Sequence, residues 1–90
     1  MPHYFLDIRN GNGFTADLEG QDQAGLAEAV AAARTGARSL MAADLAEGHL
    51  DTSGSIDVCD SEHVLLVTVT FAEVLAAATL NHPPSPPTAR

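Results

Sequence analysis

The sequence has no lysine, one cysteine and no apolar run that approaches the roughly 20 residues of a membrane-spanning helix. With Cys59 alone, no disulfide can form within the chain, and this favours a reducing compartment. The opening stretch MPHYFLDIRN has no cationic segment before an apolar one, so we do not expect a secretory signal. These absences predict a cytoplasmic protein that does not enter membranes.

The lack of lysine leaves four basic residues against twelve acidic ones, for a formal net charge of −8. Nucleic-acid binding depends on cations that neutralise phosphates, and anionic membrane surfaces attract basic segments. The charge balance therefore argues against nucleic acid and against membranes as partners. An acidic surface keeps a small protein soluble, and it can also attract a basic protein.

The 90 residues are enough for one domain only. The last ten, NHPPSPPTAR, hold four of the five prolines, so residues 81–90 are predicted to be a disordered tail. Residues 1–80 then form a single α+β domain, close to the size at which one hydrophobic core is only just sufficient. A domain of this size often gains stability by pairing with a copy of itself or with another protein.

The first quarter of the chain predicts a β-hairpin. Residues 3–9 alternate between the two faces of a strand with a period of two. The asparagines and glycines at 10–13 suit a tight turn, because both residue types tolerate positive φ. Residues 14–17 are predicted to be a short return strand, followed by a loop at 19–22.

Between residues 23 and 47 the apolar spacing changes to the 3.6-residue period of a helix. The predicted buried stripe is rich in alanine, which lets a helix lie close to a sheet. Its members are Leu26, Val30, Ala33, Ala37, Leu40 or Met41, and Asp44 or Leu45. Asp22 is the predicted N-cap and Gly48 the residue after the helix end. Gly36 interrupts the helix, and we expect it to allow close packing on a strand or a slight bend.

The second half predicts another hairpin and a short helix. Residues 56–59 alternate, residues 60–63 form a polar loop, and residues 64–71 (VLLVTVTF) are the strongest strand pattern in the chain. Residues 72–80 suit a short helix. The predicted fold class is therefore α+β, with two β-hairpins flanking one long helix (β-β-α-β-β) and a short C-terminal helix.

The segment 64–71 is apolar on both faces, which is typical of a strand that is central in its sheet or covered on both sides. One long helix covers one face of a four-stranded sheet. The other face is predicted to carry Phe5, Val64 and Leu66, with Cys59 as a further candidate. Because a large uncovered apolar face is unusual in a monomer, we expect a homodimer or another protein partner.

Asp7 and Arg9 are two residues apart on one predicted strand, so both side chains point to the same face. They are candidates for gripping a polar ligand. A surface ion pair is the simpler interpretation, and Arg9 has two other possible partners, the turn at 10–13 and Asp17. A closed pocket around Arg9 would favour a ligand, and an exposed Arg9 would disfavour it.

No catalytic or metal-binding constellation is evident in the sequence. Cys59 and His63 are four residues apart, but a zinc site needs about four ligands. Cys59 would act as a nucleophile only with a base within hydrogen-bond reach, and a half-buried sheet position is the simpler interpretation. Residues 10–13 lack the spaced acids of a calcium loop. We therefore predict no catalytic residue, no metal, no cofactor and no enzymatic activity.

The opening PHYFLDIRNG, residues 2–11, resembles that of a family of small uncharacterised bacterial proteins that usually begin MPRYFFDIRDG. Asp17 and Gly20 match an aspartate and a glycine that this family carries before its helix. The resemblance continues through the segments 48–51 and 67–71, to about residue 75. It implies a family but no activity, cofactor or ligand.

The chain departs from this family at His3, where arginine is usual, and at Asn10 and Asn12, where aspartates are usual. A looser similarity in architecture is to small antitoxin domains of the HicB type, whose D-L-P-G turn corresponds to DLEG at residues 17–20. That similarity implies a regulatory partner for a basic toxin.

The leading hypothesis is a non-enzymatic interaction module that binds itself or another protein. An antitoxin-type partner and a small-ligand binder that uses Asp7 and Arg9 are the alternatives.

Overall fold

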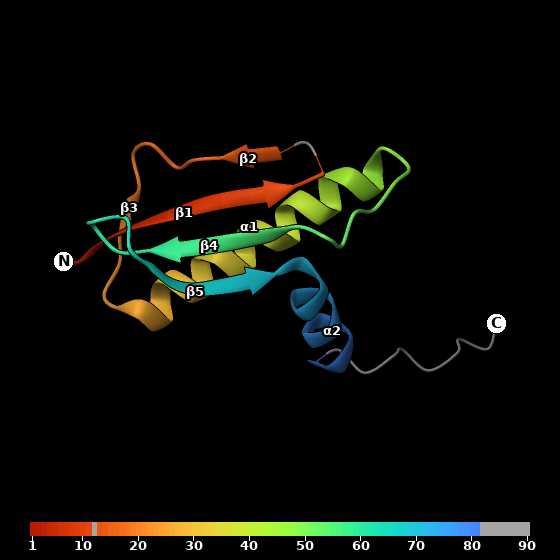
Figure 1. Cartoon of the computed structure of the whole chain (residues 1–90). Coiled ribbons are helices and arrows are strands. Elements are labelled where there is room, and N and C mark those ends of the chain that lie inside the picture. Colours follow the sequence, from red (N-terminus) through yellow and green to blue (C-terminus); the bar gives the residue numbers. More distant parts are fainter. Residues whose placement is uncertain (12, 82–90) are drawn as a thin grey trace.

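The computed structural model contains one antiparallel sheet and two helices, and this confirms the α+β class (Figure 1). It describes residues 1–11 and 13–81, and for residues 79–81 it describes the main chain only. In chain order the elements are β1 (His3–Asn10), β2 (Gly13–Thr15), β3 (Gln21–Asp22), α1 (Leu26–Ala46), β4 (Ser55–Cys59), β5 (Leu65–Thr70) and α2 (Phe71–Asn81). The order across the sheet is β2-β1-β4-β5, and β3 pairs with the start of β1.

Both predicted hairpins form, but the return strand of the first is interrupted. β2 ends at Thr15 rather than at residue 17. The chain then leaves the sheet and returns as β3, which pairs Gln21 with Tyr4 inside the segment predicted to be a loop. On this side, β1 therefore lacks a strand partner between Tyr4 and Ile8 in the described residues.

The long helix begins three residues later than predicted and ends one residue earlier, at Ala46. Its N-cap is Gly25 rather than Asp22, because Asp22 belongs to β3 and its side chain contacts His3 instead. At the other end, Gly48 has φ +94° and follows the C-cap, as predicted. The amides of Gly48 and His49 reach back to the last turn of the helix, the pattern of a glycine-terminated helix.

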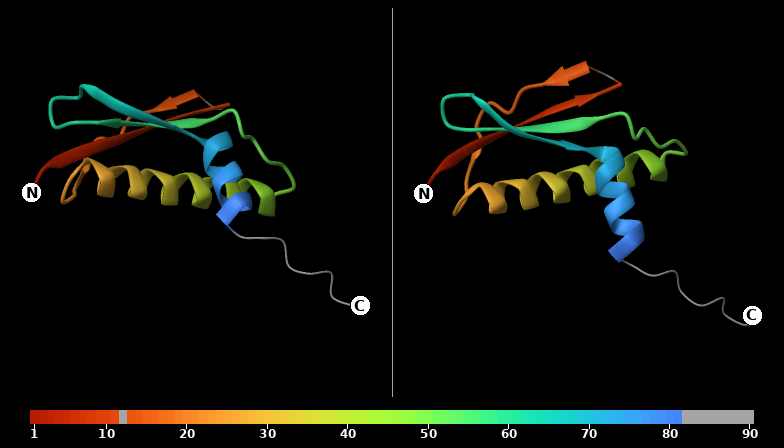
Figure 2. Two further views of the ribbon diagram at one scale, coloured as in Figure 1. Left: turned by 90° about the horizontal axis from the view of Figure 1, so that it is seen from below. Right: turned by 60° about the horizontal axis from the view of Figure 1, so that its bottom comes forward.

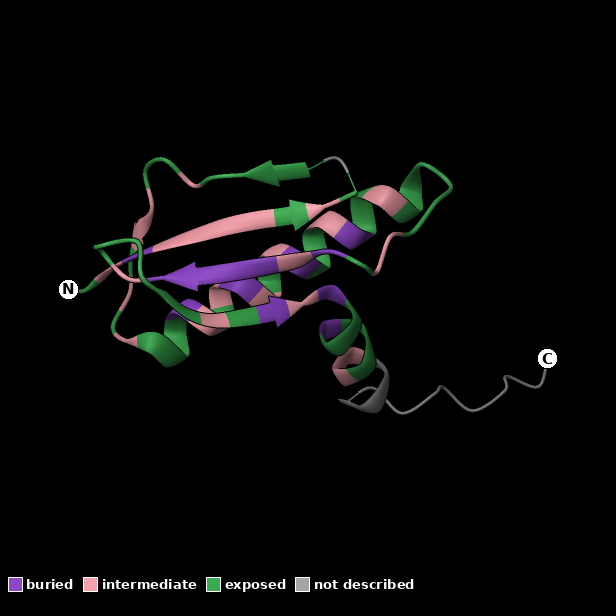
Figure 3. Ribbon diagram, viewed as in Figure 1, coloured by how far each residue is buried: buried purple, intermediate pink, exposed green. Residues whose placement is uncertain are grey.

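The core lies between α1 and the sheet and is thin. Along α1 the buried residues recur every fourth position, at Ala29, Ala33, Ala37 and Met41, so the predicted stripe is correct for Ala33, Ala37 and Met41 and wrong for Leu26. They face buried side chains of the sheet and of α2: Tyr4, Ile56, Val58, Val69, Phe71 and Val74. Figure 3 shows this layer, with β4 as the most buried strand.

The prediction that residues 64–71 form a central strand is wrong, because β5 is the last strand of the sheet. Val67 and Val69 belong to the core or pack against it, whereas Leu65 and Leu66 lie outside it, beside a register shift opposite Cys59. Phe71 is the first residue of α2 and not the end of the strand.

A Thr-x-x-Glu motif starts α2 directly after β5. The Glu73 carboxylate accepts the Thr70 amide at 3.1 Å, and the Thr70 hydroxyl accepts the Glu73 amide at 3.1 Å. This reciprocal pair is a capping box, and it begins the helix without a loop.

Both helices lie on the same side of the sheet. Figure 2 shows α1 running along the sheet and α2 descending beside it from the end of β5. The short helix therefore does not cover the second face. No described helix covers that second face, which we call the open face.

The C-terminal boundary differs from the prediction by one residue, since α2 ends at Asn81. The rest of the predicted disordered tail lies outside the described residues. Within the described part of the chain, no helix combines the length and the apolar character needed to cross a membrane.

Two glycines of this core predict opposite effects of the same substitution. A methyl group at Gly36 would lie 3.5 Å from Ile56 Cδ1, an ordinary contact, so Gly36→Ala should raise the free energy of unfolding by up to about 1 kcal/mol through helix propensity. At Gly54 it would lie 2.7 Å from Phe71 Cε2 and 2.9 Å from the Arg9 carbonyl oxygen. Gly54→Ala should therefore destabilise by about 1–3 kcal/mol.

Urea unfolding of both variants measures the two effects. Equal shifts of the midpoint in the same direction would contradict the packing described here.

Candidate functional site

Strand register places a polar group at the centre of the open face. Asp7 lies opposite Asp57, and Asp57 lies opposite Thr68 on the next strand. Phe5 is opposite Cys59, and Arg9 is opposite Phe14. The expectation of an apolar second face is therefore wrong at its centre, because alternate residues of β1 and β4 direct carboxylates there.

Asp57 is the buried charge of this group, with 6% of its surface exposed. Its carboxylate accepts a hydrogen bond from Arg9 Nε at 2.9 Å and another from the Thr68 hydroxyl at 3.0 Å. Both oxygens thus have a donor, which offsets the cost of burying the charge. The pair joins two strands whose residues are 48 positions apart.

Arg9 serves this contact and remains open to solvent. Its side chain is 62% exposed, and its guanidinium lies 5.0 Å from the centre of the Phe14 ring. Arg9 therefore binds Asp57, a partner the sequence did not suggest. Its exposure disfavours the ligand-binding alternative.

Asp7 holds a loop that replaces the missing strand partner of β1. Its carboxylate accepts the Asp17 amide at 2.8 Å. The Asp17 carboxylate in turn accepts the Leu6 amide at 3.0 Å and the Gly20 amide at 3.0 Å. The Asp17 side chain thus provides a hydrogen-bond acceptor for the Leu6 amide of β1, at a point where neither β2 nor β3 pairs with the strand.

Gly20 completes this loop, and its conformation requires glycine. It has φ +68°, and a methyl group there would lie 2.6 Å from the Tyr4 carbonyl oxygen. Asp17 and Gly20 are the aspartate and glycine matched in the sequence, so that motif has a structural explanation: it closes the β1 edge.

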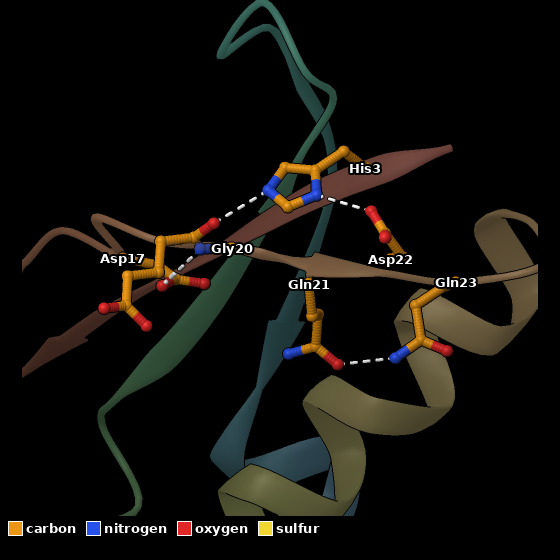
Figure 4. Close-up of polar contacts among 7 residues, drawn as sticks. His3, Asp17, Gly20, Gln21, Asp22 and Gln23 are labelled. Carbon is orange, nitrogen blue, oxygen red and sulfur yellow. Dashed lines mark hydrogen bonds and ion pairs between the residues drawn. The ribbon is translucent and has the colours of Figure 1, made fainter. Parts of the chain in front are cut away.

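His3 fastens the same edge through both ring nitrogens (Figure 4). Nδ1 lies 2.7 Å from an Asp22 carboxylate oxygen, and Nε2 lies 2.7 Å from the Glu19 carbonyl oxygen. Both partners accept hydrogen bonds, so this geometry favours the protonated ring, in which both nitrogens donate. The hydrogen bond to Asp22, and then that to Glu19, raise the pKa of His3.

Aromatic rings continue from His3 along the open face. The Phe5 ring meets His3 edge-on at 5.2 Å and stacks on His63 at 4.2 Å. His63 has φ +66° in the tight loop between β4 and β5, where its amide donates to the Asp60 carbonyl oxygen. Phe5, predicted to be a binding residue, is therefore partly covered by the protein's own histidines.

The remaining candidate chemistry is not assembled. Cys59 is buried, and burial and the nearby carboxylates of Asp7 and Asp57 raise the pKa of its thiol, which opposes thiolate formation. Among the described residues, no three histidine, cysteine, aspartate or glutamate side chains gather in a way that could hold a metal ion.

Exposed apolar side chains gather instead at the start of β5. Val64, Leu65 and Leu66 are 53%, 54% and 41% exposed, and we call these three residues the apolar triad. Val64 and Leu66 were predicted to be binding residues, and Leu65 lies between them. The triad and the β5 edge form the candidate functional surface.

The His3 contact predicts a pH dependence. Because the folded-state pKa of His3 is raised above its ordinary 6.5, the contact stabilises the fold fully below that value and is lost as pH rises through the folded-state pKa. Asp22 and Asp17 face the ring and favour its charged form. The free energy of unfolding should therefore fall as pH rises above about 6.5.

His3→Arg should lack this fall, because arginine donates to both oxygens at any pH in the range. An NMR titration of the His3 ring supplies the direct measurement. A His3 pKa at or below 6.5 in the folded protein would contradict the assignment.

Removing the contact between Arg9 and Asp57 is expected to reduce the stability of the fold rather than its binding of a ligand. Arg9→Met keeps an unbranched side chain over Phe14 but leaves the Asp57 carboxylate with the Thr68 donor alone. We expect the free energy of unfolding to fall by about 1–2 kcal/mol, and by less when Asp57→Asn is added. An unchanged urea midpoint for Arg9→Met would rule out the structural role.

A comparison with protein families matches residues 3–72 to a domain of unknown function, DUF6894. The match covers the whole sheet and α1 and ends at the second residue of α2. No curated protein and no solved structure matches the chain. Since the family model spans most of the 90 residues, the chain belongs to the DUF6894 family, as the resemblance of its opening residues indicated.

Proposed function

We propose that this protein is a non-enzymatic interaction module whose partner is a second copy of itself. The observation that carries the proposal is the apolar triad on the outermost strand of the sheet. Three consecutive apolar side chains, each at least 41% exposed, lie at the start of this strand. Clusters of exposed apolar side chains on small soluble proteins mark interaction sites.

The size of the core supports the same conclusion. Its largest fully buried side chains are three valines and one phenylalanine: Val58, Val69, Val74 and Phe71. Covering the triad would add apolar burial at about 25 cal/mol per Å². A second copy of the chain provides this apolar burial without any other protein.

The polar groups of the open face support a non-enzymatic role. Asp57, Asp17 and Asp7 each accept hydrogen bonds from the protein itself. The thiol of Cys59 is buried. These groups act in holding the sheet together. A single buried cysteine suits a reducing compartment, and we place the module in the cytoplasm.

The proposal predicts a mass of twice 9.3 kDa by analytical ultracentrifugation at micromolar to millimolar concentration. Because each copy carries a net charge of −8, added salt should strengthen the association by screening repulsion. Binding of a basic partner, as the antitoxin alternative requires, would weaken with salt. A mass of 9.3 kDa at all concentrations and salt levels would refute self-association.

A matched pair of leucines supplies the control. Leu65→Arg places a charge in the triad, and Leu18→Arg places the same charge on a leucine that is 88% exposed in the loop before β3. Leu65→Arg should weaken association by at least about tenfold, a difference of about 1.4 kcal/mol, while Leu18→Arg should leave it unchanged. Equal effects would show that net charge, and not the triad, governs the mass.

A further inference from the structure

Among the described residues, no strand pairs with the outer side of β5. The Phe71 amide donates to the Gly54 carbonyl oxygen at 2.9 Å. This bond identifies which residues of β5 direct their main-chain groups to β4. Along an antiparallel strand, the amide and carbonyl groups of successive residues point alternately to the neighbouring strand and away from it. Those of Val67 and Val69 therefore point to β4, and those of Thr68 point outward. The next outward amide, that of Thr70, is accepted by Glu73.

The opposite edge of the sheet is protected by several devices. β2 has three residues and β3 has two, and very short edge strands offer little to a partner. Between them, the Asp17 carboxylate occupies the Leu6 amide. On β5, Glu73 occupies the Thr70 amide in the same way, but the strand has six residues, and no charged residue or proline lies between Val64 and Ala72.

Building on the proposed function, we propose that self-association pairs β5 antiparallel with β5 of a second copy about a twofold axis near Thr68. The two sheets then form one continuous sheet. The six residues of β5 are all uncharged, so no like charges lie directly opposite one another despite the net charge of each chain. A strand of this composition is self-complementary, as a twofold interface requires.

Antiparallel pairing also explains the position of the apolar triad. The start of one β5 lies beside the end of the other, where α2 begins. Each triad then lies at the junction of the two sheets instead of at a free edge.

Amide hydrogen exchange of the full chain, followed by NMR at low and high protein concentration, tests the proposal. The Thr68 amide should become protected by at least about tenfold as the dimer forms, while the Val67 and Val69 amides are protected at both concentrations. A dimer in which the Thr68 amide exchanges freely would overturn strand pairing and leave the proposed function standing. A monomer at both concentrations would overturn both.

Two variants at one position test the same edge. Thr68→Pro removes the outward donor without removing a bond to β4, and it should weaken dimerisation by at least about tenfold. Thr68→Val removes only the hydroxyl contact with Asp57 and should dimerise like the original chain. Equal dimerisation of the two folded variants would overturn the proposal, and if Thr68→Pro does not fold, the exchange experiment decides.

Discussion

The close approach of α1 to the sheet governs the rest of the structure, and the alanines at 29, 33 and 37 permit it. Small side chains make a thin layer between helix and sheet, so few large residues are fully buried. Leucines that a thicker core would enclose, such as Leu45 and Leu65, remain more than half exposed. A domain with so small a core has little excess stability, so contacts at the edges of its sheet contribute a large share of that stability.

The general outline of the fold could be predicted because it depends on local patterns. Period-two alternation identified β1, β4 and β5, and Gly48 marked the end of α1 through a preference for positive φ. Position within the sheet is not a local property. Residues 64–71 look like a central strand because they are apolar throughout, yet strand order leaves them at the edge, with the leading leucines outside the core.

The polar contacts could be predicted only in part. Asp7 and Arg9 were recognised as neighbours on one face, but the partner of Arg9 is Asp57, which strand register alone brings alongside. The roles of Asp17 and His3 depend on a loop that interrupts a hairpin, a feature that no spacing rule describes. The Thr-x-x-Glu motif at the start of α2 was present in the sequence and could have been recognised as a capping box.

The central claim is that one edge of the sheet is closed by the chain's own side chains and the other by a second copy. Isotope-filtered NMR on a mixture of labelled and unlabelled protein tests it most directly, because it detects only contacts between chains. The account predicts cross-peaks between the two Thr68 residues and between Leu66 of one chain and Thr70 of the other. Interchain cross-peaks confined to the open face, for example at Phe5 or Phe14, would contradict it.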